Sequence, residues 1–129
     1  MSVAFGIGQL AGAMDRLPPR LIVDRIFPAL PVPARAPLEW VLHFGYGAAG
    51  GAAYAIAARP ATRGPLTGSL FGLAVWAAGY EGWVPAIGVL PPAHRDRRAR
   101  AVTILLAHLV YGAALGGVGH RLHGSAAAR

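Results

Sequence analysis

Long runs of apolar residues alternate with short segments rich in arginine and proline along this sequence. A helix needs about 20 mostly apolar residues to cross the hydrocarbon layer of a bilayer, and three runs meet that length. They predict membrane-spanning helices at about residues 38–58, 65–90 and 101–119. A fourth run, at about residues 2–17, is apolar but shorter before its first charged residue. We expect it to span the membrane as well, by snorkelling of its ends.

The connector after the first run carries a short amphipathic pattern at about residues 19–28. Proline suits the first turn of a helix, and Arg20 and Asp24 stand four residues apart, where they can pair on one side. Pro28 ends the pattern. The segment is therefore predicted to lie as a helix in the membrane interface; an extended loop is the alternative that the pattern leaves open.

Two of the runs share a motif. Residues 43–51 and 108–117 both read H-x-x-Y-G-A-A followed by a glycine pair, and a Leu-Pro-Pro triplet precedes each copy, at 17–19 and 90–92. The unit of helix, triplet, basic connector and His-Tyr-Gly helix thus occurs twice in the same orientation, which indicates a parallel repeat. The predicted fold is all-α: a polytopic four-helix transmembrane bundle built from two repeated helical hairpins, forming a single domain over residues 1–129.

Composition supports this fold, since 55% of the residues are hydrophobic and 13% are charged, about half the charged fraction of a soluble domain. The net charge is +7 and all 12 basic residues are arginines. They gather in the connectors and form no aromatic-interleaved stripe, so we expect no nucleic-acid binding. There is no cysteine, which excludes thiolate-bound zinc and iron–sulfur clusters.

The arginines are unequal on the two sides of the predicted bundle. One side holds eight, in the first and third connectors: Arg16, Arg20, Arg25, Arg35, Arg95, Arg97, Arg98 and Arg100. The other side holds four: Arg59, Arg63, Arg121 and Arg129. Cytoplasmic loops carry the excess of basic residues, so we expect both termini on the outer face of a bacterial inner (cytoplasmic) membrane.

Glycines spaced four apart occur in every predicted helix. Helices in lipid associate by close backbone approach at such small residues, and the spacing puts them on one helix face. The residues expected to pack helix against helix are Gly47, Gly51, Gly68, Gly72, Gly112 and Gly116.

Glu81 is the one acidic residue inside the predicted spans 65–90 and 101–119, and an ionised group near mid-bilayer costs at least about 2.5 kcal/mol. At about 1.5 Å per residue, Glu81 and His108 have similar depths, and His43 falls in the same half of the bilayer. With Tyr46 and Tyr111 they are expected to form an intramembrane polar layer. Three interpretations stay open: a proton relay or ligand site, a structural hydrogen bond between helices, or a Glu81 near the interface because the helix ends lie elsewhere.

A pair of histidines on facing helices could ligate a haem axially, and this is a further alternative for His43 and His108. His94, His120 and His123 lie in basic tails and are expected to be solvated. No nucleophile with a base at recognisable spacing appears, and Gly6-Ile7-Gly8 lacks the rest of a phosphate loop. We therefore expect no catalytic residue, metal site or cofactor, and no enzymatic activity.

The layout resembles the YagU-type bacterial inner-membrane proteins, a family of unassigned function. The shared features are Leu-Pro-Pro-Arg at 17–20, the His43 helix with its glycine-rich continuation, Gly-Val-Leu-Pro-Pro at 88–92 and His-Leu-Val at 108–110. They cover about 100 residues. This chain lacks the longer N-terminal region and long second connector of such proteins. The resemblance implies an inner-membrane location and a stress-related role, and supplies no catalytic residues.

The first functional hypothesis is a non-enzymatic inner-membrane protein that forms an oligomer or serves as an accessory subunit of a membrane complex. Its expected partners are the lipid bilayer and a second copy or another membrane protein. The alternatives are a small proton-coupled transporter or channel that uses Glu81, and a haem-binding redox subunit.

Overall fold

The computed structural model describes residues 17–59 and 63–127, with side chains through His120. Every regular element in these ranges is helical and none is a strand, so the predicted all-α class is confirmed for this part of the chain. The first predicted helix lies, apart from Leu17, outside the described residues. The elements are α2 (Pro18–Ile26), α3 (Val32–Ala57), α4 (Pro65–Ala77), the π-helix η2 (Ala78–Trp83), α5 (Val84–Ala86), the 3₁₀ turn η3 (Ala93–Arg95) and α6 (Arg98–Ala127).

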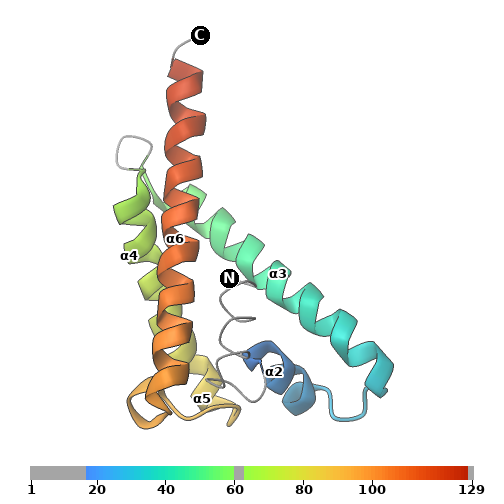
Figure 1. Cartoon of the computed structure of the whole chain (residues 1–129). Coiled ribbons are helices and arrows are strands. Elements are labelled where there is room, and N and C mark those ends of the chain that lie inside the picture. Colours follow the sequence, from blue (N-terminus) through green and yellow to red (C-terminus); the bar gives the residue numbers. More distant parts are fainter. Residues whose placement is uncertain (1–16, 60–62, 128–129) are drawn as a thin grey trace.

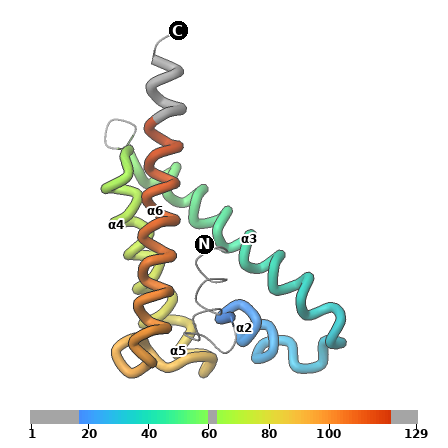
Figure 2. Tube along the Cα trace, viewed as in Figure 1, coloured from blue at the N-terminus to red at the C-terminus, as the bar shows by residue number. Residues whose placement is uncertain are grey.

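The helices form a close pair and an inclined third member. Figure 1 shows α4 and α6 side by side, whereas α3 leans away from them and approaches the pair near its own C-terminal end. There the Tyr54 hydroxyl lies 3.2 Å from Thr67 Oγ1 of α4, and the Tyr54 and Phe71 rings are 5.3 Å apart. Figure 2 shows α2, α5 and the starts of α3 and α6 gathered at the opposite end of the molecule, called the connector end below.

Four glycines let α4 and α6 approach to backbone contact. A Cβ added to Gly68 would lie 2.0 Å from the carbonyl oxygen of Gly112, and one added to Gly72 would lie 2.2 Å from that of His108. From α6, a Cβ on Gly116 would meet the Gly64 oxygen at 1.9 Å. No side chain fits at these positions, which places Gly68, Gly72, Gly112 and Gly116 of the predicted packing set in one helix–helix contact.

Gly47 and Gly51 do not take part in this backbone contact, and their predicted packing role stays a prediction. A Cβ on Gly47 would meet nothing within 4 Å, and one on Gly51 would reach only the Leu115 side chain at 3.4 Å. The reason is the inclination of α3, which keeps its backbone away from α6 over this stretch. The two copies of the repeated motif therefore have different surroundings, Gly112 packed against backbone and Gly47 open.

α3 begins six residues earlier than the predicted start at residue 38. Pro33 lies in the first helical turn, where no intrahelical bond is lost. Pro37 lies inside the helix and removes one backbone hydrogen bond there without ending it. Arg35 stabilises this end, because its guanidinium donates to the carbonyls of Leu30 and Pro28 at 2.9 Å each. It also pairs with Asp24 of α2 at 2.9 Å.

The predicted helix at 65–90 is helical only to residue 86 and is not α-helical throughout. In an α-helix the ring of Pro85 would clash with the carbonyl four residues earlier, and the wider π-turn of η2 moves that carbonyl away. The run ends at Gly88, whose φ of 72° suits glycine. Val89 N–H donates to Val84 O at 3.2 Å and Gly88 N–H to Pro85 O at 2.9 Å, which is the Schellman pattern of a helix end.

The two remaining helices keep the predicted positions with different ends. α2 spans Pro18–Ile26 against a predicted 19–28, and the predicted pair is present, with Arg20 Nε 3.5 Å from Asp24 Oδ1. α6 spans Arg98–Ala127 against a predicted 101–119. Arginine is a good helix former, so the basic residues before 101 extend this helix instead of ending it.

Length and composition mark one helix of the described residues as able to cross a membrane: Arg98–His120 of α6, which has 23 residues and contains an 18-residue stretch with a mean hydropathy of 1.8. α3 is 26 residues long, but its glycine, histidine and tyrosine residues lower its hydropathy. α4 has 13 residues before the π-helix interrupts it. The structure thus gives weak support for membrane association through one helix, and the bundle of four spans stays a prediction.

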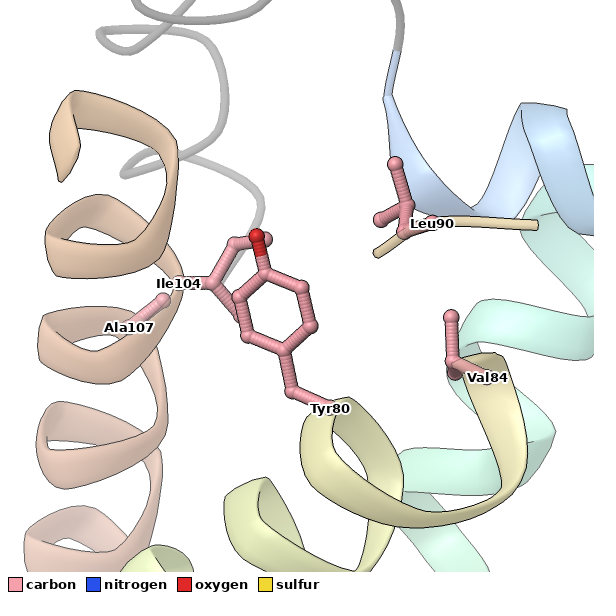
Figure 3. Close-up of a cluster of buried hydrophobic side chains, with 5 residues drawn as sticks. All are labelled: Tyr80, Val84, Leu90, Ile104 and Ala107. Atoms are coloured by element: carbon pink, nitrogen blue, oxygen red, sulfur yellow. The ribbon is translucent and has the colours of Figure 1, made fainter. Parts of the chain in front are cut away.

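The buried core lies at the connector end, between η2, α5 and α6. Tyr80, Val84, Leu90, Ile104 and Ala107 are each at most 8% exposed. Figure 3 shows the Tyr80 ring between Ile104 of α6 and Val84 of α5. This cluster fixes the chain reversal that follows Gly88 against the start of α6.

Candidate functional site

An apolar cavity of about 660 Å³ lies beside this core, between α2, α3, the helical run 65–86 and α6. Its walls are mainly aliphatic and aromatic side chains, and none of the described lining residues is Asp, Glu, Lys or Arg. Its volume falls within the range of about 300–1,000 Å³ that is typical of small-molecule sites. The lining residues that carry polar atoms are His43, Tyr46, Trp76, Tyr80, Trp83 and His108.

His108 is the buried polar residue of this cavity, with 9% of its surface exposed. Its Nδ1 lies 2.8 Å from the carbonyl oxygen of Ile104, one turn earlier on α6. A carbonyl oxygen only accepts hydrogen bonds, so Nδ1 carries the proton in the neutral ring and Nε2 keeps its lone pair. The helix backbone thus selects the tautomer and leaves Nε2 as an acceptor.

His43 lines the same cavity from α3. Its ring packs edge-on against Trp40, with centroids 6.1 Å apart, and against Phe44 at 5.5 Å. These contacts orient the imidazole on a helix that otherwise leans away from its neighbours. The structure therefore brings His43, Tyr46 and His108 of the predicted polar layer to one cavity.

Glu81 is not part of that group. Its Oε2 lies 2.9 Å from Nδ1 of His94, and its Oε1 accepts from the His94 backbone N–H at 3.2 Å. The Glu81 side chain is 35% exposed and that of His94 is 60% exposed. The sequence predicts Glu81 in one polar layer with His108, and the structure instead pairs it with His94, which follows the chain reversal at Gly88. The interpretation of a Glu81 near the interface agrees with the helical run ending at residue 86 and not at residue 90. His94, expected to be solvated alone, is its partner.

Tyr111, the fifth residue of the predicted polar layer, is not among the lining residues of the cavity. Its hydroxyl donates to the carbonyl oxygen of Gly47 at 2.5 Å. This bond joins α6 to α3 where the inclined helix has no backbone contact of its own. Tyr46 instead faces the helical run 65–86, its ring centroid 6.2 Å from that of Trp83. The two tyrosines of the repeated motif therefore serve different contacts.

A second polar cluster, which the sequence analysis missed, joins η2 to the start of α6. The Tyr80 hydroxyl donates to Oδ2 of Asp96, and Arg100 Nη1 lies 3.2 Å from Asp96 Oδ1. The Asp96 side chain is 3% exposed and that of Arg100 is 13% exposed. The spacing of Asp96 and Arg100, four residues apart at a helix start, was the available signal. Its burial beneath Tyr80 could not be read from spacing.

Further bonds tie α2 to both neighbours at the connector end. Arg25 Nε donates to the carbonyl oxygen of Ile87 at 3.0 Å, which links α2 to the end of the helical run. Arg20 Nη1 lies 3.9 Å from Oε2 of Glu39, near the start of α3. These ion pairs therefore lie at the connector end of the molecule, and the cavity opens beside them.

Comparisons with protein-family models, with curated proteins and with solved structures found no match to this chain. The resemblance to YagU-type proteins therefore stays a prediction. The helices, the cavity and the polar clusters are therefore the features that bear on the function of this chain.

Proposed function

We propose that this chain is a non-enzymatic, multi-pass protein of a bacterial inner membrane. In this arrangement α3, the helical run 65–86 and α6 cross the bilayer, together with the predicted helix at 2–17, and α2 lies at the cytoplasmic surface. The connector end, with its arginines, faces the cytoplasm, in accord with the excess of basic residues in cytoplasmic loops.

The observation that carries this proposal is the distribution of exposed apolar side chains. Three helices bear large apolar side chains that are exposed within the single chain. In water such surface would be costly at about 25 cal/mol per Å², whereas lipid tails accept it. The large apolar residues that are more than half exposed are Val32, Val41, Phe44 and Ile56 of α3, Leu66 and Leu70 of α4, and Val102, Leu106, Val110 and Val118 of α6.

Helix lengths also support the proposal. Over residues 65–86 the hydrogen-bond pattern changes from α to π and back, but the helical elements follow one another without a gap. At about 1.5 Å per residue this run approaches the roughly 30 Å thickness of the hydrocarbon layer. π-turns and prolines are compatible with membrane helices, since neighbouring helices satisfy the freed backbone groups.

The position of α3 supports a role in assembly. This helix leans away from α4 and α6, and a Cβ at Gly47 would meet open space. A small residue on an open face lets another helix approach closely in lipid. We therefore propose that α3 packs against a second copy of the chain or a helix of another membrane protein.

The transporter alternative is not favoured by this geometry. Glu81 pairs with His94, whose side chain is 60% exposed, at the connector end and outside the cavity. A proton carrier at mid-bilayer depth would need Glu81 to face the helix pairs instead.

Topology reporters test the membrane proposal. A reporter fused after Arg63 and one fused after Arg97 are expected to give opposite signals, because the helical run 65–86 separates them. With a phosphatase reporter, which is active outside the cytoplasm, the Arg63 fusion should be active and the Arg97 fusion inactive. Equal signals from the two fusions would refute a spanning helix between these sites.

Substituting Gly47 by leucine tests the assembly role of α3. The added side chain points into open space within one chain, so the monomer fold is expected to persist while the oligomer or complex is lost. Light scattering or native electrophoresis in mild detergent measures the mass. Gly45→Leu is the matched control, since a Cβ at Gly45 also meets nothing within 4 Å and lies about 200° away around the helix. A Gly47→Leu protein of unchanged assembled mass would contradict the role.

A further inference from the structure

We propose that the cavity between α2, α3, the helical run 65–86 and α6 binds a neutral, membrane-soluble amphiphile whose hydroxyl group donates a hydrogen bond to Nε2 of His108. The chemical class is a long-chain or isoprenoid alcohol, or a quinol. The proposal rests on the membrane location proposed above, because such molecules reach a protein through the bilayer.

The shape and charge of the cavity select a neutral, largely apolar occupant. About 660 Å³ is ample for a head group and part of a chain. With no Asp, Glu, Lys or Arg among the described lining residues, a carboxylate or ammonium head would lose its hydration without gaining an ionic partner. Fatty acids and phospholipid heads are therefore disfavoured relative to an uncharged alcohol.

His108 sets the polarity of the head group. The Ile104 carbonyl, 2.8 Å from Nδ1, holds the proton on that nitrogen, and Nε2 is left as an acceptor. A ligand carbonyl or ether oxygen cannot satisfy an acceptor, whereas a hydroxyl can. A donor on the ligand therefore suits Nε2, and an acceptor suits Trp76 Nε1, the buried lining atom that has no hydrogen-bond partner among the described residues.

Two further lining side chains, Tyr46 and Trp83, supply donors. A Cβ built on Gly79 would lie 3.7 Å from Trp83 Nε1 and 3.9 Å from the Tyr46 hydroxyl. Both polar atoms therefore lie against the same glycine of η2, and both side chains line the cavity. The hydroxyl oxygen of an alcohol both donates and accepts, which matches an acceptor and donors within one cavity.

The test uses tryptophan fluorescence of the full chain in mild detergent. Trp76 and Trp83 line the cavity, so a Trp40→Phe background leaves the two reporters near the site. Bromine quenches tryptophan fluorescence on contact. Three brominated probes are therefore titrated, each in a separate experiment: dibrominated stearyl alcohol, dibrominated octadecane, and dibrominated stearic acid at alkaline pH. We expect saturable quenching by the alcohol, with a half-quenching concentration about five- to tenfold lower than for the other two probes. This difference is the one that a single buried hydrogen bond produces.

Two variants on neighbouring residues localise the effect. Ala49→Phe fills the cavity from α3, and Ala48→Phe adds the same ring at an adjacent exposed position that does not line it. The first should abolish preferential quenching by the alcohol and the second should keep it. In His108→Leu, the alcohol should quench only at the concentration at which octadecane quenches. Circular dichroism checks that the helix content of this variant is unchanged.

Equal quenching by all three probes, or an unchanged preference in Ala49→Phe, would overturn the proposal, since it would indicate general contact with detergent-borne chains. Quenching by none of the probes would overturn it too, because the cavity would then be filled by other parts of the molecule. Failure of the membrane proposal is read separately, from the Arg63 and Arg97 reporters.

Discussion

Gly112→Ala is expected to lower the free energy of unfolding by about 3 kcal/mol, near the upper end of typical overpacking effects. A Cβ at this position would lie 2.1 Å from the Gly68 carbonyl oxygen and 2.8 Å from its carbon. These are backbone atoms of α4, which cannot move aside as a flexible side chain would. α6 must therefore shift away from α4 along the contact formed by Gly68, Gly72 and Gly116.

The measurement is a titration with a denaturing detergent, followed by circular dichroism, on the protein in mild detergent. Gly117→Ala is the matched control, because it adds the same methyl group to the same helix where nothing lies within 4 Å. It should be neutral or stabilising by up to about 1 kcal/mol, since alanine is the better helix former. Equal losses for the two variants would show that α4 and α6 do not meet at these glycines.

Asp96→Ala is expected to destabilise the protein by about 3 kcal/mol or more, the usual effect of removing one partner from a buried ion pair. The Arg100 side chain is 13% exposed and would keep its charge without a carboxylate. Its Nε already lacks a hydrogen-bond partner among the described residues. The Tyr80 hydroxyl would lose its acceptor as well, so the junction of η2 with α6 is the part expected to open first.

Glu81→Gln serves as the comparison, because it alters an ion pair of the same connector end in an exposed setting. Its side chain is 35% exposed and its partner's is 60% exposed, so an effect below about 1 kcal/mol is expected. Both variants are followed by the same detergent titration. An Asp96→Ala effect as small as that of Glu81→Gln would mean that the Tyr80–Asp96–Arg100 cluster is open to solvent.

The two copies of the repeated motif are similar in sequence but differ in their surroundings. Its two copies contain the same histidine, tyrosine and glycine spacing, yet Gly112 packs against backbone while Gly47 faces open space. The Tyr111 hydroxyl bonds to Gly47, which lies 64 residues earlier. Spacing within a helix predicts which residues share a face, but not which neighbour that face meets.

The sequence by itself determined the all-α class and the approximate helix positions of the described part, together with the Arg20–Asp24 pair. These depend on apolar periodicity, on proline and glycine at helix ends, and on contacts within four residues, all of which are local. The helix ends differ from the predicted ones by several residues. Prolines do not stop the start of α3, arginines extend the start of α6, and Gly88 ends the third helical run early.

Only the tertiary structure decided the partner of Glu81, the burial of Asp96 and the bond between Tyr111 and Gly47. The first two involve the segment that follows the chain reversal at Gly88, and the third joins α6 to the inclined α3. Such contacts follow from how whole helices incline and pack, and that is a balance of many weak interactions that no local pattern encodes.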